Sequence, residues 1–314
     1  MSSTRRLRVI EGRPWREALV CALAPEAPYQ PWHGLDEVGP GDTAVVVIAT
    51  DPPTVLCAFE VGAEPVRRTI AARWQLTGTS LRTVQEVEQT AGGLHLAHGP
   101  PVDSRAAEAL IVAVDDYAVG RPAERVGTGS VAGGRILLES GGRCTCCHAA
   151  VDLAHTAAED LSLHLVSEAD FADGRDWPAL LCPACTREMA LGGFDSVIDY
   201  AYSRQPACPA CSARRTREVS YGMPTYERHL NMPPWIGGGG CVVGSSGRWL
   251  CGECGHSWGS VMDPVPPDEL PRLNTAARKL FAEWTGVSNP ELLAALWNNL
   301  NATDRRFWLD RAGE

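Results

Sequence analysis

The sequence lacks several features that mark particular protein classes. Of its 28 basic residues only Lys279 is a lysine, which leaves 27 arginines and suggests a bacterium with a GC-rich genome. No run of about 18 apolar residues occurs, so no transmembrane helix is predicted. No apolar signal-type segment follows Met1, so we expect an unsecreted, cytoplasmic protein.

The charge balance is acidic, although one part of the chain departs from it. There are 38 acidic and 28 basic side chains, and the resulting net charge of −10 argues against a nucleic-acid binder that is basic along its whole length. Residues 191–260 are the exception, with six basic and five acidic residues. The length of 314 residues, with 45% hydrophobic residues, predicts a folded protein of more than one domain.

Residues 1–118 predict an α+β domain, and α+β is the fold class expected for the whole chain. The β-branched run at residues 44–49 indicates a buried strand. The Asp-Pro-Pro sequence at 51–53 ends it, and residues 54–59 return as a hairpin partner. A first helix is expected from Pro14, because proline suits the first helical position.

Composition divides the remaining chain into four parts. Residues 119–134 have the glycine-rich composition of a linker, and residues 135–200 and 201–262 are predicted zinc modules. Residues 263–314 form a predicted helical tail, because apolar residues recur there at i, i+3 and i+4. The apolar faces of this tail are a candidate surface for a protein partner.

Eight of the 12 cysteines occur in four CxxC pairs. Two intervening residues let the chain turn so that both thiolates reach one ion, and two pairs complete a tetrahedral Zn²⁺ site. Without a secretion signal, we expect two structural zinc sites rather than disulfides. The pairs are Cys144/Cys147, Cys182/Cys185, Cys208/Cys211 and Cys251/Cys254.

Further motifs surround the third and fourth pairs. They are Tyr221-Gly222-Met223-Pro224, then Gly239-Gly240-Cys241-Val242-Val243, then Arg248-Trp249-Leu250-Cys251 through Cys254-Gly255-His256-Ser257-Trp258. This pattern resembles a group of small bacterial zinc-ribbon proteins without an established activity. The resemblance implies that these two pairs share one ion in a zinc ribbon.

The pairing of the CxxC motifs has two solutions on spacing alone. Sequential pairing joins the first pair to the second and the third to the fourth, whereas crossed pairing joins the second to the third. We favour sequential pairing because of the ribbon resemblance. Cys146 is an alternative ligand to Cys147, while Cys21, Cys57 and Cys241 are predicted to be buried small apolar residues.

Arginines cluster beside the first cysteine pair of this ribbon. Arg214, Arg215 and Arg217, with Arg204 in the same cluster, are candidate nucleic-acid ligands, because guanidinium groups bind phosphate oxygens in pairs. Tryptophans at 235, 249 and 258 are candidate stacking faces for unpaired bases. The alternative for the arginines is a solvated basic turn.

Residues 144–186 place histidines between two CxxC pairs. This order resembles HNH (ββα-metal) nucleases, in which such pairs hold a structural zinc around a hairpin and a helix. The resemblance implies a general-base histidine, either His155 or His164, and a catalytic Mg²⁺ or Mn²⁺. The asparagine of the motif is absent and Thr186 replaces its last histidine, so the catalytic set is incomplete and endonuclease activity stays open.

Trp32-His33-Gly34-Leu35 and the hairpin after it resemble the start of a PUA/EVE-type barrel. Such domains read modified bases in an aromatic pocket after base flipping, which implies Trp32 and Trp74 as pocket residues. Together the resemblances predict a DNA-binding zinc protein, a modified-DNA reader fused to a degenerate HNH-type nuclease. The alternative is a non-catalytic zinc-ribbon scaffold for protein–protein interaction.

Overall fold

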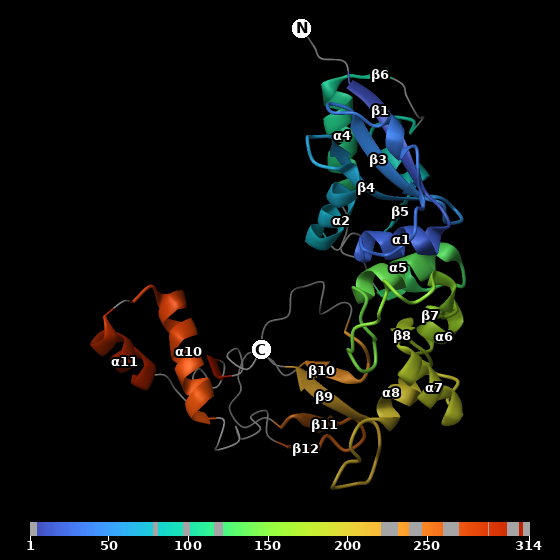
Figure 1. Cartoon of the computed structure of the whole chain (residues 1–314). Coiled ribbons are helices and arrows are strands. Elements are labelled where there is room, and N and C mark those ends of the chain that lie inside the picture. The colour runs from blue at the N-terminus through green and yellow to red at the C-terminus, as the bar shows by residue number, and fades with distance from the viewer. Residues whose placement is uncertain are drawn as a thin grey trace. The chain divides into compact units, whose positions relative to one another are not determined.

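The computed structural model groups the chain into two compact units, residues 1–204 with 224–234 and residues 205–223 with 235–314. Helices and mixed sheets occur together, which confirms the α+β class (Figure 1). No helix among the described residues is long and apolar enough to cross a bilayer. The described residues are 5–77, 81–96, 101–115, 122–220, 232–238, 247–259, 270–287, 289–299 and 308–309.

The first unit begins with a six-stranded sheet in the order β2-β1-β3-β4-β5, with β6 also paired to β1. β1 and β3 are parallel, and β3 and β4 form the antiparallel hairpin predicted from the sequence. The strands are β1 (Arg5–Gly12), β2 (Trp32–His33), β3 (Thr43–Ile48), β4 (Thr54–Glu60), β5 (Arg82–Thr83) and β6 (Pro101–Val102).

The described strands form an open sheet and not a closed barrel, which corrects the barrel-like form expected for the N-terminal domain. The edge strands β2 and β5 are not paired with each other, and the sheet contains a further strand, β1, that the sequence patterns did not predict. It joins β3 in parallel through a crossover that contains a helix. Such a crossover places the helix on a face of the sheet.

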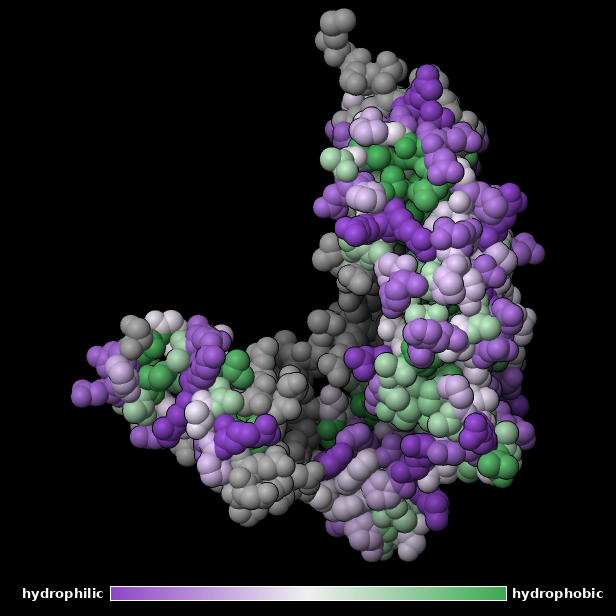
Figure 2. All heavy atoms as spheres, in the orientation of Figure 1, coloured by the Kyte–Doolittle hydropathy of each residue, from purple (hydrophilic) through white to green (hydrophobic). Residues whose placement is uncertain are grey.

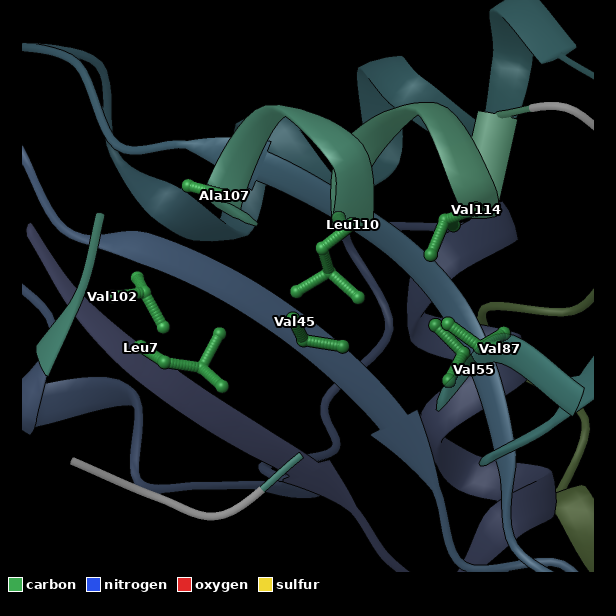
Figure 3. Close-up of a cluster of buried hydrophobic side chains, with 9 residues drawn as sticks. Leu7, Val45, Val55, Val87, Val102, Ala107, Leu110 and Val114 are labelled. Carbon is green, nitrogen blue, oxygen red and sulfur yellow. The ribbon is translucent and has the colours of Figure 1, made fainter. Parts of the chain in front are cut away.

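Helices cover both faces of this sheet. A Cβ added at Gly12 would lie 2.6 Å from Ala18, so the first helix packs closely against that face. On the other face Leu110 packs with Val45 (Figure 3). Burial from both sides explains the nearly unbroken apolar run of β3. The helices are α1 (Trp15–Leu23), η1 (Leu35–Glu37), α2 (Val66–Thr77), α3 (Val84–Thr90) and α4 (Ser104–Asp115).

Helix α5 (Ser130–Ser140) begins inside the stretch whose composition predicts a linker. Its glycines serve close packing, because a Cβ added at Gly134 would lie 3.1 Å from Leu19 of α1. The Arg135 guanidinium donates to the carbonyl oxygen of Leu81 at 2.6 Å. The helix is therefore part of the packed structure.

The first unit continues with short elements around the first cysteine pairs. Strands β7 and β8 pair antiparallel, joined by a connection that contains α6, and α7 follows β8 directly; we call this pair the β7–β8 hairpin. The elements are η2 (Pro122–Arg125), η3 (Ala158–Asp160), β7 (Ser162–His164), α6 (Glu168–Ala172), β8 (Ala179–Leu181), α7 (Pro183–Leu191) and α8 (Val197–Ser203).

The second unit contains a four-stranded sheet in the order β10-β9-β11-β12 and a helical tail. Part of the apolar stripe of the tail is core, since Trp297 is 1% exposed and packs with Phe281, whereas Leu292 and Leu296 are 51% and 37% exposed. The elements are β9 (Thr216–Ser220), β10 (Ile236–Gly238), β11 (Trp249–Cys251), β12 (Ser257–Trp258), α10 (Leu270–Thr285) and α11 (Pro290–Asn299).

Apolar side chains are not completely covered. Figure 2 shows hydrophobic residues that remain visible among hydrophilic ones on the N-terminal part of the chain. In the helical tail Trp284 is 72% exposed, although its ring lies 5.5 Å from that of Trp308.

A buried ion pair joins η2 to α5. Arg125 Nε lies 2.9 Å from Glu139 Oε2, and both side chains are largely buried. The guanidinium also lies over the Trp177 ring, 5.3 Å from its centroid. Burial outweighs the attraction of Arg125 and raises the pKa of Glu139 to about 7.

This raised pKa predicts a pH-dependent stability. The folded chain holds the Glu139 proton at higher pH than the unfolded chain, whose ordinary value is 4.5, so the stabilisation falls as pH rises from about 4.5 to about 7. We expect Glu139→Gln to reduce the loss of unfolding free energy over this pH range by up to about 3 kcal/mol. Denaturant unfolding of both proteins at several pH values measures it, and an unchanged pH dependence would contradict the assignment.

Candidate metal centres

Two groups of four cysteines bring their sulfur atoms together. In each group all four Sγ atoms lie within 4.8 Å of one another. We call them the first tetrad (Cys144, Cys147, Cys182, Cys185) and the second tetrad (Cys208, Cys211, Cys251, Cys254). Sequential pairing of the CxxC motifs is therefore confirmed.

The sulfur separations fit zinc. A tetrahedral ion with Zn–S bonds of about 2.3 Å needs sulfurs about 3.8 Å apart, whereas a disulfide needs about 2.0 Å. The separations are 3.7 Å for Cys147–Cys182, 3.7 Å for Cys208–Cys254 and 3.6 Å for Cys211–Cys251. Four thiolates fill every coordination position, so these are structural zinc sites that leave no position for a substrate.

Three of the four CxxC pairs adopt the same turn. The first cysteine donates its N–H to the carbonyl five residues on, and its own carbonyl accepts the N–H four residues on. For Cys144 both of these hydrogen bonds are 2.9 Å long. The residue four on is left-handed in each turn, with φ of 59° at His148, 63° at Ser212 and 70° at Gly255.

The remaining pair uses a helix N-terminus instead. Cys182 caps α7, and Pro183 takes the first helical position. The Cys182 sulfur accepts the N–H of Cys185 at 3.5 Å. Desolvation raises the pKa of Cys182, but hydrogen bonds from Cys185 and other tetrad thiols outweigh it and lower that pKa. The helix end therefore favours the thiolate that zinc requires.

A polar shell lies beside the first tetrad. Tyr200 on α8 interacts electrostatically with Cys185, and burial raises the pKa of Tyr200. Its hydroxyl accepts from Arg204 Nη1 at 2.8 Å and donates its proton to Glu188 Oε2 at 2.8 Å. Arg204 thus brings positive charge toward a site whose four thiolates exceed the charge of the ion. The sequence did not predict this shell: it grouped Arg204 with the candidate phosphate ligands, whereas Arg204 contacts Tyr200 and Glu188, and the i, i+4 spacing of Tyr200 and Arg204 is the signal for that contact.

The second tetrad lies nearer to solvent. Cys211 and Cys254 are exposed, while Cys208 and Cys251 are buried. The backbone N–H groups of Cys254 and Glu253 lower the pKa of Cys251 to about 7. A chelator in solution therefore reaches this tetrad more easily than the first.

The other cysteines that the structure describes, Cys21, Cys57 and Cys146, do not join either tetrad. Cys147 holds the position for which Cys146 was the alternative, and burial raises the pKa of Cys146 to about 12. Cys21 and Cys57 are buried, at 2% and 7% exposure, as the sequence predicts. Cys241 lies outside the described residues, as do the Tyr221–Pro224 and Gly239–Val243 motifs.

The two candidate catalytic histidines have different surroundings. His155 is exposed, and its Nδ1 lies 2.9 Å from Asp152 Oδ1. His164 on β7 is half-buried, with Nε2 2.5 Å from Asp176 Oδ2. Among the described residues only the two tetrads gather three or more metal-binding side chains, so neither histidine has such a set for Mg²⁺ or Mn²⁺.

Asp176 explains what His164 does in the fold. Its second oxygen accepts the Val197 N–H at 2.8 Å, at the start of α8. His164 therefore braces the β7–β8 hairpin against the loop that positions α8. Desolvation raises the pKa of Asp176, but the hydrogen bond from His164 and backbone N–H groups outweigh it and lower that pKa.

The expected base-pocket tryptophans do not form a described pocket. Trp32 is half-buried and packs on the domain, since a Cβ added at Gly12 would lie 2.8 Å from its ring. The Trp74 side chain lies outside the described residues, and only the backbone of α2 is described there. His33, the neighbour of Trp32, points to the opposite face of the sheet.

In the second ribbon, the zinc ribbon around the second tetrad, Arg214, Arg215 and Arg217 are exposed, whereas Arg248 on β11 is half-buried and ion-paired with Glu218. Arg214 and Arg215 follow the Cys208 turn, and Arg217 lies on β9. The Arg215 carbonyl accepts the Gly252 N–H at 2.9 Å, which ties the backbone of this turn to the Cys251 turn. The arginines therefore project from a fixed backbone.

The ribbon tryptophans take two roles. Trp235 is 2% exposed and belongs to the core, which leaves no face for a base. Trp249 and Trp258 pair across β11 and β12, and the His256 ring stacks on Trp258 with centroids 5.8 Å apart. Arg217 lies opposite Leu250 in the register, so it is on the other face from this tryptophan pair.

The polar shell predicts slower zinc loss from the first tetrad. We expect Tyr200→Phe and Arg204→Gln to speed zinc release from that tetrad about tenfold, because they remove hydrogen bonds and charge around the thiolates. Release of zinc into a colorimetric chelator measures this. Cys211→Ser removes a ligand of the second tetrad and so identifies the faster phase of release as that tetrad's zinc. Arg187→Gln, an exposed arginine on α7, is the matched control. Equal acceleration by the control would contradict the role of the shell.

The left-handed turn residue predicts a contrast at His148. We expect His148→Gly to be neutral or stabilising, because glycine adopts φ near 59° without strain. His148→Val should destabilise by about 1–2 kcal/mol, since a β-branched residue is strained there. Thermal unfolding of the two variants with zinc bound measures this, and equal melting temperatures would contradict the strain account.

Comparisons with known proteins complete the description of these sites. No family model, no curated protein and no solved structure matches the chain. The similarities of residues 144–186 to HNH modules and of the N-terminal segment to PUA/EVE domains therefore stay sequence predictions. What the chain itself establishes is a protein with two cysteine tetrads fit for zinc.

Proposed function

We propose that this protein binds nucleic acid through its second zinc ribbon, with both zinc ions holding the fold. The observation that carries the proposal is the set of three exposed arginines at the Cys208 turn and on β9. Guanidinium groups bind phosphate oxygens in pairs, and because the backbone that carries them is already held in place, binding does not have to order it.

The contact expected is with the phosphate backbone rather than with bases. Arg217 and the Trp249–Trp258 pair lie on opposite faces of the sheet, so one strand cannot use both in a single stacked arrangement. Phosphate contacts position a protein without reading sequence. We therefore infer sequence-tolerant binding to DNA, with any base recognition supplied elsewhere in the chain.

A degenerate HNH-type module is the finer part of this proposal. Its support is the order of elements around the first tetrad: the Cys144 turn, the β7–β8 hairpin, and α7 carrying the second cysteine pair. His155 beside Asp152 is an arrangement that orients a general base. The region is acidic, with four basic and nine acidic residues at 131–190, which disfavours phosphate. We therefore propose DNA binding as the primary activity, ahead of DNA cleavage.

A second candidate is a scaffold that docks a protein through the helical tail. The observation in its favour is the exposed apolar surface of that tail, with Trp284 at 72% and Leu292 at 51% exposure. Aromatic residues of this kind often anchor protein interfaces. This candidate predicts that removal of the arginine charges leaves partner binding unchanged.

The proposed function predicts a salt-dependent DNA affinity. Each phosphate contact adds a slope of about −0.9 to log K against log salt, so three contacts give about −3. We expect Arg214→Gln and Arg217→Gln each to reduce that slope by about one. Fluorescence anisotropy with a labelled DNA duplex, at salt concentrations from about 50 to about 200 mM, measures the affinity and its slope.

The controls separate binding from folding and from cleavage. Arg187→Gln removes one exposed positive charge from the first zinc module and should leave the slope unchanged. Plasmid nicking with Mg²⁺ or Mn²⁺, compared with His155→Ala and His164→Ala, tests cleavage in the same samples. A salt-independent or undetectable interaction of the zinc-loaded protein would overturn the proposal.

A further inference from the structure

The two tetrads differ in how far solvent reaches their sulfur atoms. In the first tetrad three cysteines are buried and Cys147 is half-buried. In the second tetrad Cys208 and Cys251 are 2% exposed, whereas Cys211 and Cys254 are exposed. The chain therefore carries one shielded and one accessible set of the same four ligands.

The two exposed sulfurs are close together although they come from different turns. Cys211 ends the CxxC pair that precedes β9, and Cys254 ends the pair that begins on β11. All four Sγ atoms of this tetrad lie within 4.8 Å of one another. A disulfide needs about 2.0 Å, so these two sulfurs have to approach by no more than about 2.8 Å, the difference between the two distances.

The chemistry of a zinc site directs an oxidant to its sulfur atoms. Zinc keeps its cysteine ligands deprotonated, but the ion itself does not exchange electrons. An oxidant that reaches the site therefore acts on sulfur, and cysteine oxidation follows thiolate character and exposure. At Cys211 and Cys254 both conditions are met, whereas burial opposes oxidation of the first tetrad.

We propose that the second tetrad is a peroxide-sensitive switch, in which Cys211 and Cys254 form a disulfide and release zinc. One thiolate attacks hydrogen peroxide, the O–O bond breaks, and the sulfur becomes a sulfenic acid as hydroxide leaves. The other thiolate attacks that sulfur, and a second hydroxide leaves as the S–S bond forms. Two electrons pass from sulfur to the peroxide, and two protons from solvent turn the hydroxides into water. The two cysteines that remain do not complete a tetrahedral site, so the ion leaves.

Loss of the ion changes the segment that carries the candidate phosphate ligands. Arg214 and Arg215 lie between Cys211 and β9, and the Gly252 N–H donates to the Arg215 carbonyl at 2.9 Å. The strands β9 and β11 have only five and three residues, so metal binding contributes much of the order in this segment. Oxidation should weaken DNA binding about fivefold, because the arginines then have to be ordered on binding. This consequence, unlike zinc release, rests on the proposed function.

Zinc release from the full-length, zinc-loaded protein in hydrogen peroxide tests the switch. Relative to release without peroxide, one ion per chain should be released at least about tenfold faster than the other, because burial shields the first tetrad. Alkylation under denaturing, non-reducing conditions followed by mass spectrometry should show a disulfide between Cys211 and Cys254. The cysteines of the first tetrad should be alkylated as thiols. Reductant with added zinc should restore the released ion.

Histidine variants keep the metal while they remove a reactive sulfur. Cys211→His and Cys254→His leave three thiolates and an imidazole, which is an ordinary zinc ligand set, so both should hold zinc. Each should slow peroxide-driven release about tenfold, because the disulfide cannot form. Cys147→His makes the matched change in the first tetrad and should leave that release as fast as in the wild-type protein.

Several outcomes would overturn the proposal. They are equal release of both ions, a disulfide that omits Cys211 or Cys254, and unchanged peroxide sensitivity of zinc-loaded Cys211→His. The wild-type disulfide decides the question even where a variant fails to fold.

Fluorescence anisotropy of reduced and oxidised protein measures the consequence for DNA. Binding that weakens on oxidation and returns with reductant and zinc supports it, whereas unchanged binding after complete release of one ion contradicts it. Absence of DNA binding by the reduced protein overturns the proposed function, while zinc release and the disulfide still decide the switch.

Discussion

The demand of one zinc ion for four thiolates at fixed separation is the constraint on which both modules depend. Sulfurs at 3.6–3.7 Å bring together segments that are far apart in the chain, such as Cys147 and Cys182. The strands around the tetrads have only two to five residues, and such short strands are marginal by themselves. Metal binding and folding are therefore one equilibrium in these modules.

The chain meets this constraint with two kinds of local structure around its cysteine pairs. Three pairs use a turn with a left-handed residue, while Cys182 and Cys185 use the start of α7. Because each ion is fully coordinated, chemistry or binding has to come from side chains placed around it. On the second ribbon the side chains that we propose for binding are the exposed arginines at the Cys208 turn and on β9.

The sequence predicted the features that follow from spacing and periodicity. CxxC spacing gave the tetrads, the β-branched run at 44–49 gave β3, and the apolar stripe gave the core of α10. It could not give what depends on long-range packing. The arginines of β1 interrupt the apolar pattern by which a strand is predicted. The glycines of α5 are typical of a linker, and only their packing against α1 shows that they belong to a helix. The Tyr200–Arg204 pair has the spacing of any exposed helix face.

Zinc content of paired cysteine variants tests the central claim most directly. Elemental analysis of the purified wild-type protein should give two zinc ions per chain, as the two tetrads require. Cys144→Ser with Cys182→Ser removes two ligands from one tetrad and should cost one ion. Cys182→Ser with Cys208→Ser removes one ligand from each and should weaken both sites. Full retention of zinc in the first variant, or loss of both ions from it while the second keeps one, would contradict sequentially paired structural zinc sites.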